Sequence, residues 1–585
     1  MDRKTVTILA VAFGVLYLWM WGVGKFFPPV PLPPKSTNMV AGVTNQLPIG
    51  TNNTAPVSTA VAVPSGTNAP AAIVPPGTPE ETLTLETADT TYTFTSHGGG
   101  LKRAQLKHYS ESIRNKGNLT NELVTLNEHG RAAVLAMQAD AALDDNVFTL
   151  TKTPTNTVIA EKVLPSGLRV VKQFEPASNY TLRAHIWLQN TATQTVTLPP
   201  QGISVGAAVP AGPEEDPMNS GLFWHNGQKA EHIQGAWFDN YAFACFFKRP
   251  RAEYDSGVNP VQWGAVHNQF FALAVFPDTN VVASQFKAWH RELPGVAGYR
   301  KGQNAYAFEG MLYYPATNIA PNQFVDRQFT IYAGPKQEKS LSQLRRQADV
   351  IMDFGFFSPI SKVFLRSMNW LHKFMPYGIA IIVLTIIIKA VFWPLTAAST
   401  RSMKRMQALG PEMAKIKEKY KDDPVKANKK TMEFMREKKI NPMNGCWPML
   451  VQMPIFFALF RMIPNAIELR GTPFLWVRDL SRADTLFFIP GLDFPFNLLP
   501  LIMGVTMFWQ ARLTPPSPGM DPAQQMMMKY MPLIFLVFLY NMPSGLVLYW
   551  TVQNLLTILQ TKLTKSKEAA ATVPVVAAVP AKKKK

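Results

Sequence analysis

Cysteine is nearly absent from this sequence of 585 residues, which contains only Cys245 and Cys446 and no Cys-x-x-Cys or Cys/His cluster. Cys245 lies in a charge-balanced segment and Cys446 opens an apolar run, so we expect neither a disulfide between them nor a metal site. Walker A and His-Glu-x-x-His motifs are also absent. We therefore expect no enzyme activity and no bound cofactor.

Charge is scarce as well, at 17% of residues against 47% hydrophobic ones, a balance typical of a chain with membrane and soluble parts. Residues 80–346 carry 24 Lys/Arg and 24 Asp/Glu, so the net charge of +19 comes from elsewhere. Residues 396–442 carry 13 Lys/Arg against 6 Asp/Glu, and residues 562–585 carry 7 Lys against one Glu. The basic excess therefore lies beside apolar runs late in the chain.

The N-terminal residues 1–27 begin with Arg3 and Lys4, followed by about 20 apolar residues, enough to cross a bilayer. A cleavable signal peptide is the alternative, but Trp19, Trp21 and several prolines stand where a small-residue cleavage site would be expected. We expect an uncleaved anchor with a cytoplasmic N-terminus. Residues 28–79 are rich in Pro, Thr and Ala and predict a disordered tether.

Residues 80–346 show short segments that alternate apolar and polar residues, such as TLTLET, TYTFTS, YTLRAHIWLQN and DRQFTIYAG. This period, broken by Gly, Pro and Asn, predicts antiparallel strands and a large β-sandwich. Because it follows the first span, we expect this domain to be extracytoplasmic. His97 and the three glycines after it predict a turn, since no helical pattern follows that would make a phosphate cradle.

The remainder is predicted to be helical. Residues 350–375 have apolar residues at helical spacing with basic residues between them, which indicates an amphipathic helix at the membrane interface. Residues 376–563 contain five apolar runs: Tyr377–Leu395, Cys446–Pro464, Pro495–Gln510, Lys529–Met542 and Ser544–Lys562. With the N-terminal anchor they make a multi-pass protein of six spans, whose basic segments all fall on the cytoplasmic side.

Lys389 interrupts the first of these runs, IIVLTIIIKAVFWPLT. A cation at the centre of a span costs about 2.5–3.5 kcal/mol by insertion scales, so its presence indicates a function. Thr385, Lys389 and Thr396 would share one face of a continuous helix, as the wall of a wet groove requires. The alternative is that Lys389 snorkels toward the cytoplasmic surface.

Residues 396–442 predict a cytoplasmic helical hairpin, with Asp423 capping its second helix and Pro424 beginning it. Its lysines, and those of the tail at 564–585, either form a solvated face that orients the protein or contact anionic lipid or ribosomal RNA.

Several motifs in register then resemble one family: NPMNGCWPMLVQMPIFFALFRMI, LPLIMGVTMFWQ, DPAQQMMMKYMP and NMPSGLVLYWTVQNLLTILQ. Together they resemble the YidC family of bacterial membrane protein insertases over residues 354–562. TADTTYTFTSHGGGLKRAQLKHY resembles the start of the periplasmic β-supersandwich found in the Gram-negative form.

The resemblance implies a five-helix insertase core without a cofactor, in which a basic groove residue attracts the polar segment of a nascent membrane protein. Lys389 stands where the family usually has arginine, and an ammonium cannot bind a carboxylate bidentately. It also implies a substrate path, matched here by Met453, Phe456, Phe538, Tyr549 and Trp550. The implied partners are nascent membrane proteins, the ribosome, the Sec translocon and phospholipid, but not DNA.

Two other functions compete with this interpretation. A small-solute transporter would use Lys389 to bind an anion, but it predicts internal repeats and more polar groups within the membrane, neither of which the sequence shows. A sugar-binding envelope protein would use the β domain and leave the five runs and the basic hairpin without a role.

Overall fold

The computed structural model describes residues 77–111, 122–138, 147–210, 215, 219–238, 251–278, 282–297, 304–344, 347–438, 447–491, 494–513 and 522–564. The predicted anchor at 1–27, almost all of the tether at 28–79 and the basic tail lie outside these ranges. The chain divides into two compact units, residues 1–352 and residues 353–585.

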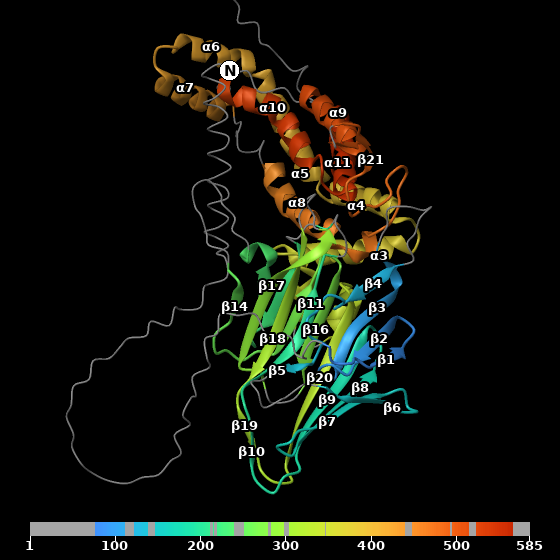
Figure 1. Ribbon diagram of the computed structural model, residues 1–585. Helices are drawn as coiled ribbons and strands as arrows, with labels where there is room; N and C mark the ends of the chain where they lie inside the picture. Colours follow the sequence, from blue (N-terminus) through green and yellow to red (C-terminus); the bar gives the residue numbers. More distant parts are fainter. Residues whose placement is uncertain are drawn as a thin grey trace, which may run out of the picture. The chain divides into compact units, whose positions relative to one another are not determined.

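The first unit is built from antiparallel strands (Figure 1). They are β1 (Thr82–Glu86), β2 (Thr90–Thr95), β3 (Gly100–Ser110), β4 (Leu123–Leu126), β5 (Met137–Gln138), β6 (Thr149–Lys152), β7 (Val158–Val163), β8 (Leu168–Pro176), β9 (Thr181–Asn190), β10 (Val196–Leu198), β11 (Gln201–Ala208), β12 (Gly221–His225), β13 (Ala230–Gln234), β14 (Glu253–Asp255), β15 (Trp263–His267), β16 (Phe271–Pro277), β17 (Gln285–Ala297), β18 (Asn304–Tyr314), β19 (Thr317–Ile319) and β20 (Phe324–Pro335).

These strands form a sandwich. A nine-stranded sheet runs in the order β13-β12-β15-β16-β20-β9-β8-β7-β6, and a five-stranded sheet runs β14-β17-β18-β11-β5. The two sheets meet where β11 and β18 pack on β15 and β16, and every residue of β11, β15 and β16 is buried. A four-stranded sheet, β1-β2-β3-β4, completes the unit. The predicted β-sandwich is confirmed.

Alternation accounts for the strands that flank this core. In β8 and β9, buried residues alternate with partly exposed ones, because successive side chains of a strand point to opposite faces. The glycines after His97 form the predicted turn: Gly98 and Gly99 have φ of 80° and 55°, values that favour residues without a Cβ.

Lys172, on β8, is fully buried and fastens this turn to the sheet. Its Nζ donates to the carbonyl oxygens of Gly98 and Leu135, each at 2.7 Å, and lies 4.8 Å from the ring centroid of Phe148. Burial, with no carboxylate partner among the described residues, lowers the pKa of Lys172 to about 7.

The second unit is helical. Its helices are α3 (Ser358–His372), α4 (Tyr377–Val391), α5 (Trp393–Ala408), α6 (Gly410–Lys419), α7 (Pro424–Glu437), α8 (Trp447–Asn465), α9 (Leu498–Leu513), α10 (Pro522–Leu539) and α11 (Ser544–Leu563), and a hairpin of β21 (Thr485–Ile489) and β22 (Phe494–Asn497) lies between α8 and α9. Between the sandwich strands and α3 lie a short helix, α2 (Glu338–Gln343), and a 3₁₀ turn, Ala348–Met352.

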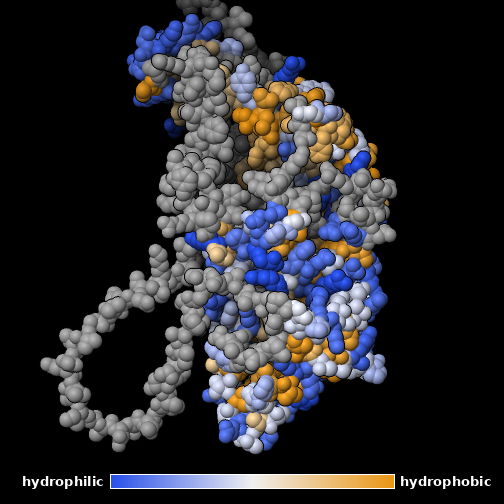
Figure 2. Space-filling view, viewed as in Figure 1, coloured by the Kyte–Doolittle hydropathy of each residue, from blue (hydrophilic) through white to orange (hydrophobic). Residues whose placement is uncertain are grey.

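The predicted cap on α7 is confirmed, since the Asp423 carboxylate accepts a hydrogen bond from the Lys426 backbone N–H at 3.0 Å. Helices α6 and α7 pack as an antiparallel pair (Figure 1). In the face seen in Figure 2, hydrophilic residues cover this pair and hydrophobic ones gather over α9 and α10.

Two boundaries differ from those expected. The run Tyr377–Leu395 was predicted as one helix, but α4 ends at Val391 and α5 begins at Trp393, with a 66° bend between Tyr377–Val391 and Thr396–Met406. Pro394 explains the break, because its ring cannot donate a hydrogen bond and clashes with the carbonyl of residue 390. Helix α10 begins at Pro522, before the predicted Lys529, because the Gln- and Met-rich residues there favour helix without being strongly apolar.

Within the described ranges, no individual helix is both long enough and apolar enough to cross a bilayer by itself. The bent pair Tyr377–Val391 and Thr396–Met406 has the length and composition for a span only when its two helices are counted together.

Candidate functional site

A stripe of polar side chains runs along one face of α11, most of whose other residues are apolar. Tyr549, Gln553, Thr557 and Gln560 follow one another at intervals of four, four and three residues, so they lie on one face of the helix. We call these four residues the polar stripe. Each of them forms a hydrogen bond with a residue of another helix, so the polar stripe connects α11 to α4, α5 and α8.

Lys389 reaches this stripe from α4. Its Nζ donates a hydrogen bond to the Thr557 hydroxyl at 2.9 Å, and only 6% of the residue is exposed. The Thr557 hydroxyl in turn donates to the Gln553 carbonyl at 2.7 Å. Among the described residues, no Asp or Glu forms an ion pair with Lys389. The site therefore holds a buried lysine whose hydrogen-bond partner is a neutral hydroxyl rather than a carboxylate.

Thr396 meets the same stripe from α5. Its hydroxyl accepts a hydrogen bond from Gln560 Nε2 at 2.6 Å and donates to the Phe392 carbonyl at 3.0 Å. Because the helix breaks after Val391, Thr396 does not share one continuous helix face with Lys389 as we predicted. Helix α11 brings the two together instead, through Thr557 and Gln560.

Thr385 lies one turn before Lys389 and is buried. Its hydroxyl donates to the Ile381 carbonyl at 2.6 Å, within its own helix. The hydroxyl oxygen can still accept a hydrogen bond, so Thr385 extends the polar surface of α4 without bonding to α11.

The other end of the stripe meets α8. Gln452 Nε2 donates to the Tyr549 hydroxyl, and Gln553 Nε2 lies 3.4 Å from Gln452 Oε1. Among the residues that the structure describes, the buried Gln553 Oε1 atom has no hydrogen-bond partner. A buried amide oxygen without a hydrogen bond costs free energy, so this end of the polar stripe has an acceptor available to bind a donor.

Two more cross-helix contacts flank the stripe. Asn554 Nδ2 donates to the Thr506 hydroxyl of α9 at 3.2 Å. Lys404 Nζ, from α5, donates to the carbonyls of Thr561 at 2.9 Å and Thr564 at 2.7 Å, where α11 ends. A cation at a helix C-terminus is favourable because the last carbonyls lack partners in the helix.

Sequence reasoning missed Thr557, Gln553, Gln560 and Gln452. The signal was present in α11, where TVQNLLTILQ repeats polar residues every three or four positions. Nothing local indicates that Lys389 meets Thr557, because 168 residues separate them.

The residues predicted to line a substrate path come together in part. The rings of Phe456 and Trp550 meet edge to face with centroids 5.1 Å apart. Phe538 is exposed and stacks on Phe460, which neighbours Phe456. Tyr549 belongs to the polar stripe rather than to this aromatic row, and Met453 is half-buried on α8.

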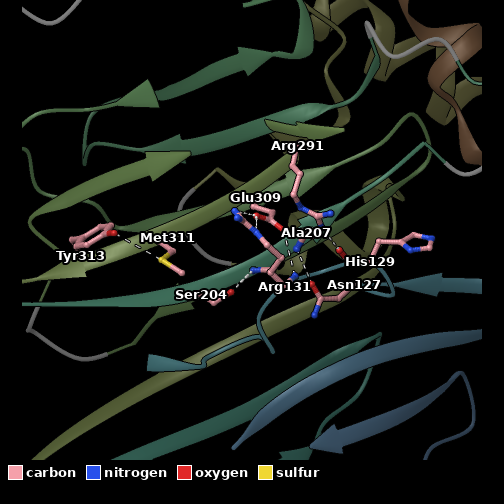
Figure 3. Close-up of polar contacts among 10 residues, drawn as sticks. Asn127, His129, Arg131, Ser204, Ala207, Arg291, Glu309, Met311 and Tyr313 are labelled. Atoms are coloured by element: carbon pink, nitrogen blue, oxygen red, sulfur yellow. Dashed lines mark hydrogen bonds and ion pairs between the residues drawn. The ribbon is translucent and has the colours of Figure 1, made fainter. Parts of the chain in front are cut away.

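The β unit holds a separate polar cluster (Figure 3). The Glu309 carboxylate accepts from Arg131 Nε at 2.8 Å and lies 3.4 Å from Arg291 Nη2, while that same Nη2 donates to the His129 carbonyl at 2.8 Å. Asn127 is fully used in backbone bonds, including one from the Ala207 N–H at 2.7 Å. These contacts fasten the 127–131 loop to β11, β17 and β18. Within the described residues, no group of His, Cys, Asp or Glu is placed to hold a metal ion.

The family models and the relatives matched by sequence agree on one family. Residues 370–571 match the family described as 60Kd inner membrane protein, and residues 82–366 match the YidC periplasmic domain. The membrane protein insertase YidC of Geobacter metallireducens is 32% identical over 96% of this chain and 98% of its own length. The corresponding protein of Pelobacter propionicus is 32% identical over 95% of this chain and 98% of its own.

Among solved structures, an active YidC insertase with its first transmembrane domain resolved covers 84% of this chain and 93% of its own, at 17% identity and a TM-score of 0.35. The near-complete alignments at about one third identity carry the assignment. This chain, with its periplasmic β-sandwich domain and its helical C-terminal region, belongs to the YidC family of membrane protein insertases.

Proposed function

We propose that this chain inserts, folds and helps assemble nascent membrane proteins through a polar groove formed by α4, α5, α8 and α11. The observation that carries the proposal is the buried Lys389, whose only hydrogen bond among the described residues goes to the neutral hydroxyl of Thr557. Thr385 and Thr396 extend the groove on the lysine side. Met453, Phe456, Phe538 and Trp550 give the apolar flank, and Tyr549 of the polar stripe lies next to Trp550 in the sequence.

The groove lowers the cost of moving a polar segment across the membrane. An acidic or polar tail of the substrate enters beside Lys389, where the stripe offers hydrogen bonds that lipid cannot supply. The substrate's apolar helix then passes along the aromatic flank and leaves into lipid. Burial of that helix supplies the free energy, so no nucleotide is required.

For the topology, we propose six spans: residues 1–27 and the five helices α4, α8, α9, α10 and α11. The N- and C-termini and the hairpin at 396–442 are cytoplasmic, and the β domain at 80–346 is periplasmic. Helix α3, within 350–375, lies in the interface, and residues 376–563 form the insertase core. The charge count supports this arrangement, because 13 Lys/Arg against 6 Asp/Glu fall in 396–442.

The basic hairpin and the tail at 564–585 supply a site for the ribosome and for anionic phospholipid. Exposed cations beside a membrane attract both kinds of phosphate. The Sec translocon is the proposed partner for larger substrates.

The test is depletion of the protein from cells with complementation by plasmid-borne variants. Insertion of a short single-span protein with an acidic periplasmic tail is followed by protease protection of that tail. We expect the tail to stay accessible to the cytoplasm on depletion and to be translocated again with the wild-type gene. Normal translocation in depleted cells would contradict the insertase assignment for such substrates.

A further inference from the structure

The connection between α8 and α9 presents apolar side chains that the groove does not use. It contains a tight turn at Phe474–Val477, closed by two backbone hydrogen bonds of 2.8 Å, and the β21–β22 hairpin. Residues 485–497, TLFFIPGLDFPFN, contain one charged residue in thirteen. Several large apolar side chains are exposed here, and the four most exposed, which we call the apolar tip, are Leu475, Phe487, Phe488 and Phe494.

The exposure of the apolar tip is substantial. Leu475 is 75% exposed, and Phe487, Phe488 and Phe494 are 53%, 47% and 48% exposed. Phe487 and Phe488 are consecutive in a strand, so they point to opposite faces of the ribbon. A two-stranded ribbon that is apolar on both faces is marginal in water, and exposed apolar patches of this kind mark interaction sites.

The connection is nevertheless held in place at its base. Asn497 Nδ2 donates to the Tyr540 carbonyl at 2.8 Å, and the Tyr540 hydroxyl donates to the Pro495 carbonyl at 2.9 Å. The Asp484 carboxylate accepts from the Leu499 N–H at 2.6 Å and from Trp476 Nε1 at 3.1 Å. The tip is therefore fixed to the start of α9 and to the end of α10 (Figure 1).

The turn shows strain of a kind that a functional role would maintain. Leu475 has φ of 52°, in the left-handed region that is uncommon for a bulky residue. In this strained conformation the Leu475 side chain points outward and is exposed, where contact with water does not stabilise it. The hydrogen-bonded base, through Asp484 and Trp476, holds that conformation.

Lipid fits this surface better than a protein partner does. The base joins the ends of α9 and α10, which themselves expose Val505 and Val537, so the tip continues an apolar surface. Both faces of the ribbon are apolar, and acyl chains surround a protrusion on all sides. The unpaired edges of the β21–β22 hairpin limit how deeply it can enter the membrane, because their backbone groups require hydrogen bonds from water or lipid headgroups. Aromatic residues with arginines nearby in sequence, as in residues 470–482, are typical of the membrane–water interface.

We propose that the apolar tip lies in the lipid interface at the α8–α9 end of the helical core, where it anchors the groove helices. That this is the periplasmic leaflet rests on the topology proposed above. The contact with lipid does not depend on that topology. A fixed anchor at one end would hold the short helices α9 and α10 at a constant depth while a substrate moves along the groove.

The test uses the full chain with Cys245 and Cys446 replaced by serine, reconstituted in vesicles of phosphatidylethanolamine and phosphatidylglycerol. Nitroxide labels are placed by Phe487→Cys, Phe488→Cys and Leu475→Cys, at positions whose side chains are exposed. Glu418→Cys, on the exposed face of α6, is the control. Electron paramagnetic resonance then measures collision of each label with oxygen and with a water-soluble nickel chelate.

We expect labels on the tip to collide several-fold more with oxygen than with the chelate, and the control label to show the reverse. Tip labels that collide with the chelate as often as the control does would overturn the proposal in favour of a water-exposed loop. Protection from both reagents would overturn it in favour of a protein partner. Loss of insertion in a Lys389 variant leaves these collision rates unchanged, so the two proposals fail separately.

Discussion

Replacing Lys389 by methionine tests the electrostatic part of the groove. Methionine keeps the length and apolar stem of lysine but removes the charge and the hydrogen bond to Thr557. Lys389→Arg is the matched control, because it keeps the charge and adds donors. Two substrates are compared, identical except that one carries acidic residues in its translocated tail and the other carries their amides.

The magnitude follows from Coulomb's law at the site. A carboxylate about 4 Å from the ammonium gains about 4 kcal/mol at an effective dielectric constant of about 20, and about 1 kcal/mol in water. The groove is polar, so its effective dielectric constant lies between these two values. We therefore expect Lys389→Met to lose about 1–3 kcal/mol of this interaction energy. Since about 1.4 kcal/mol is tenfold in rate, the acidic tail should insert roughly 5- to 150-fold more slowly.

The assay is insertion into vesicles that contain purified protein, read by protease protection over time. We expect Lys389→Met to slow the acidic-tail substrate far more than the amide substrate, and Lys389→Arg to leave both near wild type. An equal loss for both tails would refute the reasoning, because it would place the effect in folding of the helices rather than in charge attraction.

Three further predictions concern residues outside the groove. The pKa of Lys172 is lowered from about 10.4 in the unfolded chain to about 7, so the unfolded state alone holds this proton between those pH values. Stability of the β unit should therefore rise from pH 7 toward pH 10 by up to about 1.4 kcal/mol per unit, and Lys172→Met should remove that slope in thermal unfolding of the full chain. Asp423→Ala should cost α7 about 1 kcal/mol and speed amide exchange in its first turn, whereas Asp423→Asn should not. Arg461→Met should lower the thermal stability of the helical unit by about 1–3 kcal/mol, because Arg461 Nη2 bonds Asp353 Oδ2 at 2.7 Å, and adding Asp353→Asn should recover part of it.

The strands were predictable because each carries its own pattern. TLTLET, TYTFTS and YTLRAHIWLQN became β1, β2 and β9 with little change of boundary, since period-two alternation is a local property. Sheet order was not predictable, because β11 pairs with β18 across about 100 residues and no local signal selects that partner. The same holds for the burial of Lys172 against Gly98.

The helical unit divides in the same way. Apolar runs located α4 and α8 to α11, and Asp423 with Pro424 located the start of α7. The break at Pro394 was readable from its sequence but was outweighed by the apolar run around it. The β21–β22 hairpin was missed although Pro490 and Gly491 form a turn signal between two apolar stretches.

For the site, the sequence identified Lys389 but not what it meets. An isolated cation in an apolar run is visible without a structure, because its cost is large. The hydroxyl that receives its hydrogen bond lies on α11, and that pairing depends on how the helices pack.

Site-specific cross-linking to ribosome-bound nascent chains tests the central claim most directly. Photoreactive residues are placed at 389, 453 and 538 in the full chain, with Val505, exposed on α9, as the control position. If substrates pass through the groove, a stalled acidic tail cross-links from position 389 and the following apolar helix from positions 453 and 538, while position 505 yields little. Equal cross-linking from all four positions, or none from position 389, would contradict the groove as the path of insertion.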